Sequence, residues 1–434
     1  MGGYLDFVDR SHRPADDELI ALFYVEPADG ISIDEAAGRV ASESSNGTWT
    51  EVVTMSERIR RLSAKAYEFE PAGDGGFWVK IAYPIDLFEP GSMPQIWSSI
   101  AGNIFGMKAL KNLRLEDVYW PPSLVRSFPG PNFGIDGVRG ILKVEKRPIL
   151  ATVPKPKVGM TSEEHAKAAY EIWLGGVDLV KDDENLTSQS FNKFEERVKQ
   201  LFRLRDKAES ETGERKSALL NITAPYREME RRAKLVADYG GEFIMIDILT
   251  AGWAAVQSIR ELASDLGLAI HAHRAFHAAF TRNPKHGVSM KFVAQSARLV
   301  GVDHIHIGTV VGKLVSPLEE VKSCADILRK DSIPDDPQRK LLKKTWEGLK
   351  PTLPVSSGGL HPGIIPDVLE ILGTNIMVQA GGGVLGHPDG PEAGARAVRQ
   401  AIEAYLEGIS LEEYSKTHKE LRRALEHWGF LKPV

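Results

Sequence analysis

The chain has 434 residues, of which 42% are hydrophobic and 26% charged, and its formal net charge is −5. This mildly acidic balance, with no basic stripe interleaved with aromatic residues, argues against nucleic acid as a partner. No apolar run reaches the roughly 18 residues of a membrane-spanning helix, and the first residues lack a signal peptide's apolar core. Cys324 is the only cysteine, which excludes an intrachain disulfide. We therefore expect a soluble cytoplasmic protein without membrane partners.

The length exceeds that of one ordinary core, so two domains are predicted. Within residues 1–132, strands are predicted at 19–24 and 78–82 and helices at 33–43 and 94–104, without regular alternation. This mixture predicts an α+β domain with helices on one face of an antiparallel sheet. Prolines at positions 121, 122, 129 and 131 then mark the linker.

Residues 133–434 are predicted to form a TIM barrel with a helical C-terminal extension. Apolar runs alternate with segments of helical periodicity, one of which begins at a Thr161–Glu164 capping box and ends at Gly175. The extension begins at Ser410 and Glu413, a second capping box. Eight such units over about 260 residues are typical of a TIM barrel, and a doubly wound open sheet is the alternative. The eight runs are 149–153, 177–180, 218–222, 243–249, 268–270, 304–307, 353–355 and 376–380.

Nearly every ionisable group embedded in apolar sequence follows one of these runs. In a TIM barrel the carboxyl ends of the strands form one rim, where the chemistry takes place. A purely structural role would scatter such residues along the chain. The residues that lie in these runs or follow them, and that are candidates for the rim, include Lys155, Lys157, Lys181, Asp183, Glu184, Asn221, His271, His273, Arg274, His304, His306, Ser357, Gly359, Gly381 and Gly382.

The cluster after the second run predicts a metal site of an unusual kind. Lys181 and Asp183 point to the same side of a strand, and Glu184 lies just past its end. Two carboxylates suit a hard cation such as Mg²⁺, but an ammonium repels it. Addition of CO₂ to the amine reverses the lysine's charge and gives an anionic carbamate with oxygen ligands. The alternative is an ordinary salt bridge between Lys181 and Asp183.

Two other patterns predict a substrate with two phosphates. Glycines 381–383 and the Ser357-Gly358-Gly359 turn expose backbone N–H groups that can bind phosphate. Arg274, His306 and Lys313 are the expected cationic partners, and the loop 308–317 has the composition of a lid that delivers Lys313. The two His-x-His pairs, 271/273 and 304/306, are also compatible with zinc, although Arg274 would repel a second cation.

These residues resemble one family, the large subunit of ribulose-1,5-bisphosphate carboxylase/oxygenase. The resemblance extends from about residue 20 to 405. Its barrel motifs are Lys155-Pro156-Lys157-Val158-Gly159, Gly175 to Asn185, His273-Arg274-Ala275-Phe276-His277, Asp303 to His306 and Gly308 to Lys313. Residues 43–50 and 102–106 are similar to the family's N-terminal segments. The resemblance implies a ferredoxin-like first domain and carboxylation of ribulose 1,5-bisphosphate to 3-phosphoglycerate, with O₂ as the competing substrate.

The resemblance also implies a role for each matched residue. Lys181 would carry the carbamate and bind one Mg²⁺ together with Asp183 and Glu184, and the carbamate would act as the base. Lys155 would be the acid/base lysine, His273 would assist hydration and cleavage, and Lys313 would stabilise the new carboxylate. One phosphate would meet Thr48, Trp49, Lys313, Gly381 and Gly382; the other would meet Arg274, His306 and Ser357. Lys157 and Gly359 complete the substrate-binding set. Glu43, Thr48, Trp49 and Asn103 would come from a partner subunit, which implies a homodimer or an assembly of dimers.

Departures from the plant-type pattern indicate the archaeal-type (form III) branch. Ala380 replaces a phenylalanine, Pro154 replaces an isoleucine, and the tail that latches the lid is absent. In that branch the bisphosphate tends to come from nucleoside monophosphate (AMP) salvage. The nearest alternative is a RuBisCO-like enolase or isomerase that does not carboxylate. Two further alternatives are a non-catalytic protein on the same scaffold and an amidohydrolase, although the latter carries His-x-His on its first strand.

Overall fold

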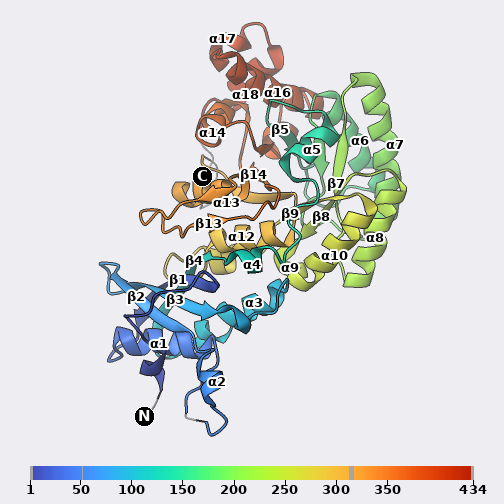
Figure 1. The fold of residues 1–434 in the computed structure, drawn as a ribbon. Coiled ribbons are helices and arrows are strands. Elements are labelled where there is room, and N and C mark those ends of the chain that lie inside the picture. The colour runs from blue at the N-terminus through green and yellow to red at the C-terminus, as the bar shows by residue number, and fades with distance from the viewer. Residues whose placement is uncertain (1–2, 51, 312–316, 432–434) are drawn as a thin grey trace. The chain divides into compact units, whose positions relative to one another are not determined.

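The structure is a computed structural model that describes residues 3–50, 52–311 and 317–431. The chain divides into two compact units (Figure 1). The first unit contains Met1–Pro129, Phe276–Val300 and Lys330–Leu349, and the second contains Gly130–Ala275, Gly301–Arg329 and Lys350–Val434. The domain boundary expected at residues 132 and 133 stays a prediction. None of the described helices combines the length and apolar character needed to cross a bilayer.

The first unit is an α+β fold built on a five-stranded sheet of order β10-β4-β1-β3-β2. The pairings of β1 with β3 and β4 and of β2 with β3 are antiparallel, whereas β10 joins the edge in parallel. The sheet strands are β1 (Glu18–Pro27), β2 (Lys65–Pro71), β3 (Phe77–Pro84), β4 (Leu110–Tyr119) and β10 (Gly287–Val288), and β12 (Ser332–Ile333) pairs with β13 (Lys344–Thr345). The helices are η1 (Tyr4–Phe7), α1 (Ile33–Glu43), α2 (Glu57–Arg60), η2 (Ile85–Leu87), α3 (Met93–Ile100), η3 (Asn103–Gly106), α4 (Pro122–Val125), α11 (Ala278–Thr281) and α12 (Met290–Val300).

A buried polar network joins distant segments of the first unit. Asp117 of β4 accepts hydrogen bonds from Gln295 of α12 and from the Lys344 ammonium of β13. Gln295 also accepts from the Trp120 indole N–H at 2.8 Å. A buried carboxylate is stable only when such partners satisfy it. The network therefore explains why the segments after β9 and α13 fold with the N-terminal sheet.

The second unit contains the predicted TIM barrel. Eight parallel strands close in the order β11-β14-β15-β5-β6-β7-β8-β9. They are β5 (Ile149–Thr152), β6 (Leu179–Lys181), β7 (Ser217–Asn221), β8 (Phe243–Asp247), β9 (Ala269–His273), β11 (His304–Gly308), β14 (Leu353–Ser357) and β15 (Met377–Gln379). Their residues are nearly all buried, as expected of parallel strands that are covered on both faces.

Helices surround this barrel, and α6, α7, α8 and α10 lie side by side on its outside (Figure 1). Helix α5 supplies Ile135, Val138 and Leu142 to the apolar core that fills the barrel interior. The helices are α5 (Gly134–Leu142), α6 (Ser162–Leu174), α7 (Phe194–Thr212), α8 (Tyr226–Asp238), α9 (Ile248–Ala251), α10 (Trp253–Leu266), α13 (Leu318–Arg329), η4 (Pro362–Ile364), α14 (Ile365–Leu372), α15 (Gly382–Leu385), α16 (Pro391–Glu407), α17 (Leu411–Ser415) and α18 (Lys419–Trp428).

Several predicted elements have different bounds in the structure. The strand expected to reach residue 249 ends at Asp247, because Ile248 already begins α9. The helix expected over 94–104 ends at Ile100, and Gly102 separates it from η3. A side chain at position 102 would clash with the Ser98 carbonyl oxygen, so this turn requires glycine. The C-terminal extension contains two helices, of which α17 begins at the predicted Ser410 cap. The Thr161–Glu164 capping box is confirmed.

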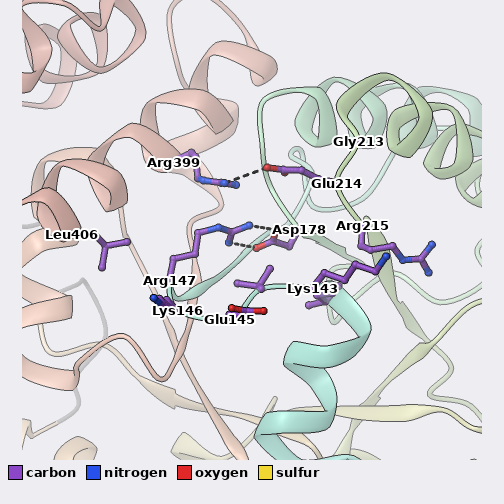
Figure 2. A pocket seen from close by; sticks show the side chains of 12 residues that line it. Lys143, Glu145, Lys146, Arg147, Asp178, Gly213, Glu214, Arg215, Arg399 and Leu406 are labelled. Atoms are coloured by element: carbon purple, nitrogen blue, oxygen red, sulfur yellow. Dashed lines mark hydrogen bonds and ion pairs between the residues drawn. The ribbon is translucent and has the colours of Figure 1, made fainter.

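A pocket of about 590 Å³ lies at the amino-terminal end of the barrel, opposite the rim (Figure 2). Two ion pairs lie in its lining. Arg147 makes two 2.6 Å hydrogen bonds to Asp178, and Arg399 of α16 donates to Glu214 at 3.2 Å. The first pair joins the segments that precede β5 and β6, and the second fastens α16 to the segment that precedes β7.

Candidate active site

Lys181, the last residue of β6, is completely buried. Its Nζ atom donates to the Asp182 carbonyl oxygen at 2.7 Å and lies 3.9 Å from Oε2 of Glu184. Burial lowers the pKa of Lys181, although the charges of Glu184 and Asp183 oppose this shift. The neutral amine, which is the form that reacts with CO₂, is therefore more populated here than on an exposed lysine.

Asp183 is paired with Lys155, which follows β5, and not with Lys181 as the salt-bridge alternative required. Nζ of Lys155 lies 2.9 Å from Oδ2 of Asp183. Asn185 donates from its backbone and its side chain to the other oxygen, at 3.2 and 3.0 Å. Burial alone would raise the pKa of Asp183, but the Lys155 ammonium and the Asn185 donors lower it overall. Asp183 is thus an anion held in a fixed orientation.

Glu184 completes the predicted cluster. Its carboxylate lies 3.6 Å from Nε2 of His273 and 3.7 Å from Nζ of Lys157. Burial favours a higher pKa for Glu184, but the charges on His273 and Lys181 outweigh it and lower the pKa. The structure therefore brings Lys155, Lys157, Lys181, Asp183, Glu184 and His273 together at the rim of β5, β6 and β9.

Asp247 is a rim residue that sequence reasoning missed. It is buried at the end of β8, and its Oδ1 atom lies 3.0 Å from Nδ1 of His273. Asn221, at the end of β7, donates to its other oxygen at 3.4 Å. The sequence does contain a signal for it, because an acid follows the apolar residues 243–246. The predicted strand, however, continues through Asp247 to residue 249 and so does not place this acid at the rim. Asp247 orients the His273 ring toward Glu184.

Four histidines occupy the barrel interior and its rim. His271 contacts His304 through their Nδ1 atoms at 3.3 Å and His306 through their Nε2 atoms at 2.8 Å. His306 then reaches Oγ of Ser357 at 2.7 Å. In the described part of the chain, no three His, Cys, Asp or Glu side chains gather as a metal-binding group. The imidazoles of the two His-x-His pairs thus contact mainly one another. The predicted Mg²⁺ site is not a group of three such side chains, because one of its ligands would be a carbamylated lysine.

Arg274, directly after β9, is the buried cation of the predicted phosphate sites. It is only 5% exposed, and burial lowers its pKa to about 10, so it stays charged near neutral pH. No hydrogen bond or ion pair joins it to another of the described residues. A buried guanidinium without a hydrogen-bond acceptor is costly even though Glu320 attracts its charge, and an anionic ligand would satisfy it.

The glycine turns lie where the barrel predicts them. A Cβ atom on Gly381 would lie 3.4 Å from Cε of Lys155, whereas one on Gly382 would meet open space. Gly359, after β14, has a φ of +73°, which favours glycine. Lys313 lies outside the described residues.

The remaining predicted residues belong to the first unit. Glu43 ends α1, Thr48 and Trp49 follow it, and Asn103 begins η3, which contacts α1. All four are exposed, and the Trp49 side chain is 78% exposed.

Comparisons with known proteins agree with this geometry. The family model described as ribulose bisphosphate carboxylase large chain, catalytic domain, matches residues 134–428, and the model of its N-terminal domain matches residues 6–124. The ribulose bisphosphate carboxylase of Pyrococcus abyssi is 55% identical over 99% of this chain and 98% of its own length.

Solved structures give the same result. The dimeric archaeal Rubisco from Hyperthermus butylicus superposes with a TM-score of 0.94 at 59% identity, covering 99% of this chain and 100% of its own. The octameric Rubisco from Pyrococcus horikoshii gives 0.92 at 53% identity, covering 99% and 97%. The chain therefore belongs to the ribulose bisphosphate carboxylase large-chain family of enzymes.

Proposed function

We propose that this chain converts ribulose 1,5-bisphosphate, CO₂ and water into two molecules of 3-phosphoglycerate. A proton leaves C3, C2 forms a bond to CO₂, water adds at C3, and the C2–C3 bond breaks as C2 takes up a proton. O₂ competes for the same carbon. The observation that carries this proposal is the buried Lys181, with a lowered pKa, between the carboxylate of Glu184 and the neighbouring anion Asp183.

Lys181 as a carbamate, Asp183 and Glu184 fit one Mg²⁺. Their donor set would be all oxygen, which Mg²⁺ prefers, and both carboxylates have lowered pKa values. When bound, the metal would polarise the substrate carbonyl and stabilise negative charge on the enediolate. Without CO₂ on Lys181, the ammonium near Glu184 disfavours a cation, so the protein is active only after it has reacted with CO₂.

Lys155 and His273 have positions suited to moving protons. Lys155 lies beside both Asp183 and Gly381, within reach of a substrate that spans the rim. There it would hold the proton that C2 takes up after cleavage. His273, oriented by Asp247, would assist the addition of water. Lys313 would stabilise the carboxylate formed from CO₂, as the family motif implies.

The two phosphates are assigned to different parts of the rim. Arg274 and Ser357 would bind one directly, with Arg274 supplying the positive charge. His306 would act from behind Ser357, because its two ring nitrogens already face His271 and Ser357. Gly381 and Gly382 would bind the other through backbone N–H groups, with Lys313 and, from a partner chain, Thr48 and Trp49. Lys157 and Gly359 border these sites.

We also propose a homodimer as the smallest active unit. The exposure of Glu43, Thr48, Trp49 and Asn103 supports it, and two similar proteins are dimeric and octameric. Similarity to archaeal relatives supports a role in nucleotide salvage. Cys324 is the only cysteine of the sequence, which supports a reducing cytoplasm.

The test uses ribulose 1,5-bisphosphate, Mg²⁺ and ¹⁴C-bicarbonate after preincubation with CO₂. Carboxylation predicts acid-stable label in 3-phosphoglycerate, with two product molecules for each CO₂ fixed. An enolase or isomerase of the same family would instead exchange the C3 proton with solvent and fix no label. Solvent exchange without acid-stable label would overturn the proposed function.

A further inference from the structure

The barrel interior contains two histidines that the proposed reaction does not use. His271 and His304 are completely buried and sit opposite each other on neighbouring strands β9 and β11. Together with His306 they form a continuous line of imidazoles that ends at Ser357 on the rim. A line of buried polar rings replaces apolar side chains that would fill the barrel at lower cost.

All three rings are neutral near physiological pH. Burial lowers the pKa of His304 to about 3, and it lowers the pKa of His271 and His306 well below the usual range. A neutral imidazole has one N–H donor and one acceptor nitrogen. Each contact in the line therefore has a direction, and the direction of one contact dictates the next.

Only two arrangements are consistent along the whole line. In the outward arrangement, His304 donates from Nδ1 to His271, His271 donates from Nε2 to His306, and His306 donates from Nδ1 to Ser357. The Ser357 hydroxyl proton is then available to a ligand at the rim. In the inward arrangement every hydrogen bond is reversed, and the Ser357 hydroxyl donates its proton to Nδ1 of His306.

The buried end of the line, at His304, distinguishes the outward from the inward arrangement. Nε2 of His304 is buried and has no hydrogen-bond partner among the described residues. The His304 ring packs against Phe243 at 5.6 Å, which offers no acceptor in the ring plane. The inward arrangement places a proton on that nitrogen and leaves a buried N–H without an acceptor. The outward arrangement leaves only a lone pair there.

We propose that His304 and His271 are positioning residues that fix the Ser357 hydroxyl as a hydrogen-bond donor to an anionic oxygen at the rim. Identifying that oxygen as substrate phosphate rests on the proposed function. The direction of the hydrogen bonds does not, because it follows from the substrate-free protein alone. An anion at the rim would reinforce the outward arrangement, since a phosphate oxygen can only accept.

Neutron diffraction of the substrate-free protein in D₂O tests the direction itself. We expect deuterium on Nδ1 of His304, Nε2 of His271 and Nδ1 of His306. Deuterium on Nε2 of His304 would overturn the proposal. This result does not depend on enzymatic activity. The proposed hydrogen-bond direction can therefore be correct even if the protein does not carboxylate, and carboxylation can be correct even if the direction is wrong.

Binding of ribulose 1,5-bisphosphate without added Mg²⁺ tests the consequence. Ser357→Ala should raise the Kd about 10-fold, the loss expected for one hydrogen bond to a charged group. His304→Leu should raise it about 3- to 10-fold, because the donor that fixes His271 is gone. His304→Asn, whose amide nitrogen can replace Nδ1, should stay within about 2-fold of the original protein.

A double variant separates positioning from general damage. If His304 acts through Ser357, adding His304→Leu to Ser357→Ala should raise the Kd no further. Fully additive losses would overturn the proposal, as would equal Kd values for His304→Leu and the original protein. Should His304→Leu fail to fold, His304→Asn alone in neutron diffraction must keep deuterium on Nε2 of His271.

Discussion

Nζ of Lys155 lies 2.9 Å from Oδ2 of Asp183, so an amine from the segment after β5 neutralises a carboxylate assigned to the metal. Mg²⁺ would have to displace this ammonium in order to bind, and Lys155 would then be free to face the substrate. The ion pair therefore connects the two proposed roles. It offsets the negative charge of Asp183, and it would hold the proposed acid/base lysine in place until activation.

Replacing Lys155 should separate metal binding from turnover. Lys155→Met removes the competing ammonium, so Mg²⁺ affinity in bicarbonate should stay equal or increase. Turnover should fall by at least about 100-fold, because a proton-transfer group is lost. Calorimetric Mg²⁺ titration and the carboxylation assay measure the two effects. Lys157→Met is the matched control, since Nζ of Lys157 lies 3.7 Å from Glu184 and is mostly exposed. Weaker Mg²⁺ binding in Lys155→Met alone would contradict the displacement.

Asp247→Asn should impair catalysis more than binding. Oδ1 of Asp247 lies 3.0 Å from Nδ1 of His273, where an ionised carboxylate can only accept, whereas an amide can donate to that nitrogen and impose the other tautomer. We expect kcat to fall by about 100-fold with KM nearly unchanged. Steady-state kinetics measures the split. Asn221→Ala, which removes a second partner of Asp247, serves as the comparison. An unchanged kcat in Asp247→Asn would exclude the orienting role.

Mixed dimers test whether two chains share each site. Glu43→Gln and Lys181→Met should each be inactive alone. In a randomly mixed dimer population, half the molecules are hybrids, and each hybrid has one intact site if sites are shared. Co-expression should then restore about one quarter of the original activity per dimer. If each chain held a complete site of its own, mixing would restore nothing, and that result would refute the shared arrangement.

Acid should destabilise the barrel through its buried histidines. The pKa of His304 falls from 6.5 to about 3 on folding, so the unfolded chain binds a proton in this interval that the folded chain refuses. Stability is therefore fully present above pH 6.5 and decreases as pH falls toward 3, by roughly 1 kcal/mol per pH unit for each such group. Urea unfolding at several pH values measures the slope. His304→Asn should make it shallower, and an unchanged slope would contradict this assignment.

The sequence predicted the barrel well because parallel strands buried on both faces appear as uninterrupted apolar runs. It also predicted the rim, since polar residues directly follow those runs. Asp247 was missed because an acid between Ile246 and Ile248 was read as part of the strand. The Lys155–Asp183 pair and the His304–His271 contact could not be predicted, because each joins residues whose separation depends on how the barrel closes. No local pattern indicates that α12 and β13 fold with the N-terminal sheet.

Direct trapping of the carbamate tests whether Lys181 functions only after it has reacted with CO₂. The protein is incubated with ¹⁴C-bicarbonate and Mg²⁺, the carbamate is alkylated with an oxonium salt, and the labelled peptide is identified. We predict close to one label per chain, located at Lys181, with more label at higher pH as the amine loses its proton. Lys181→Met should carry none. Label absent from Lys181 in a protein that nevertheless fixes CO₂ would show that the carbamate on Lys181 is not required.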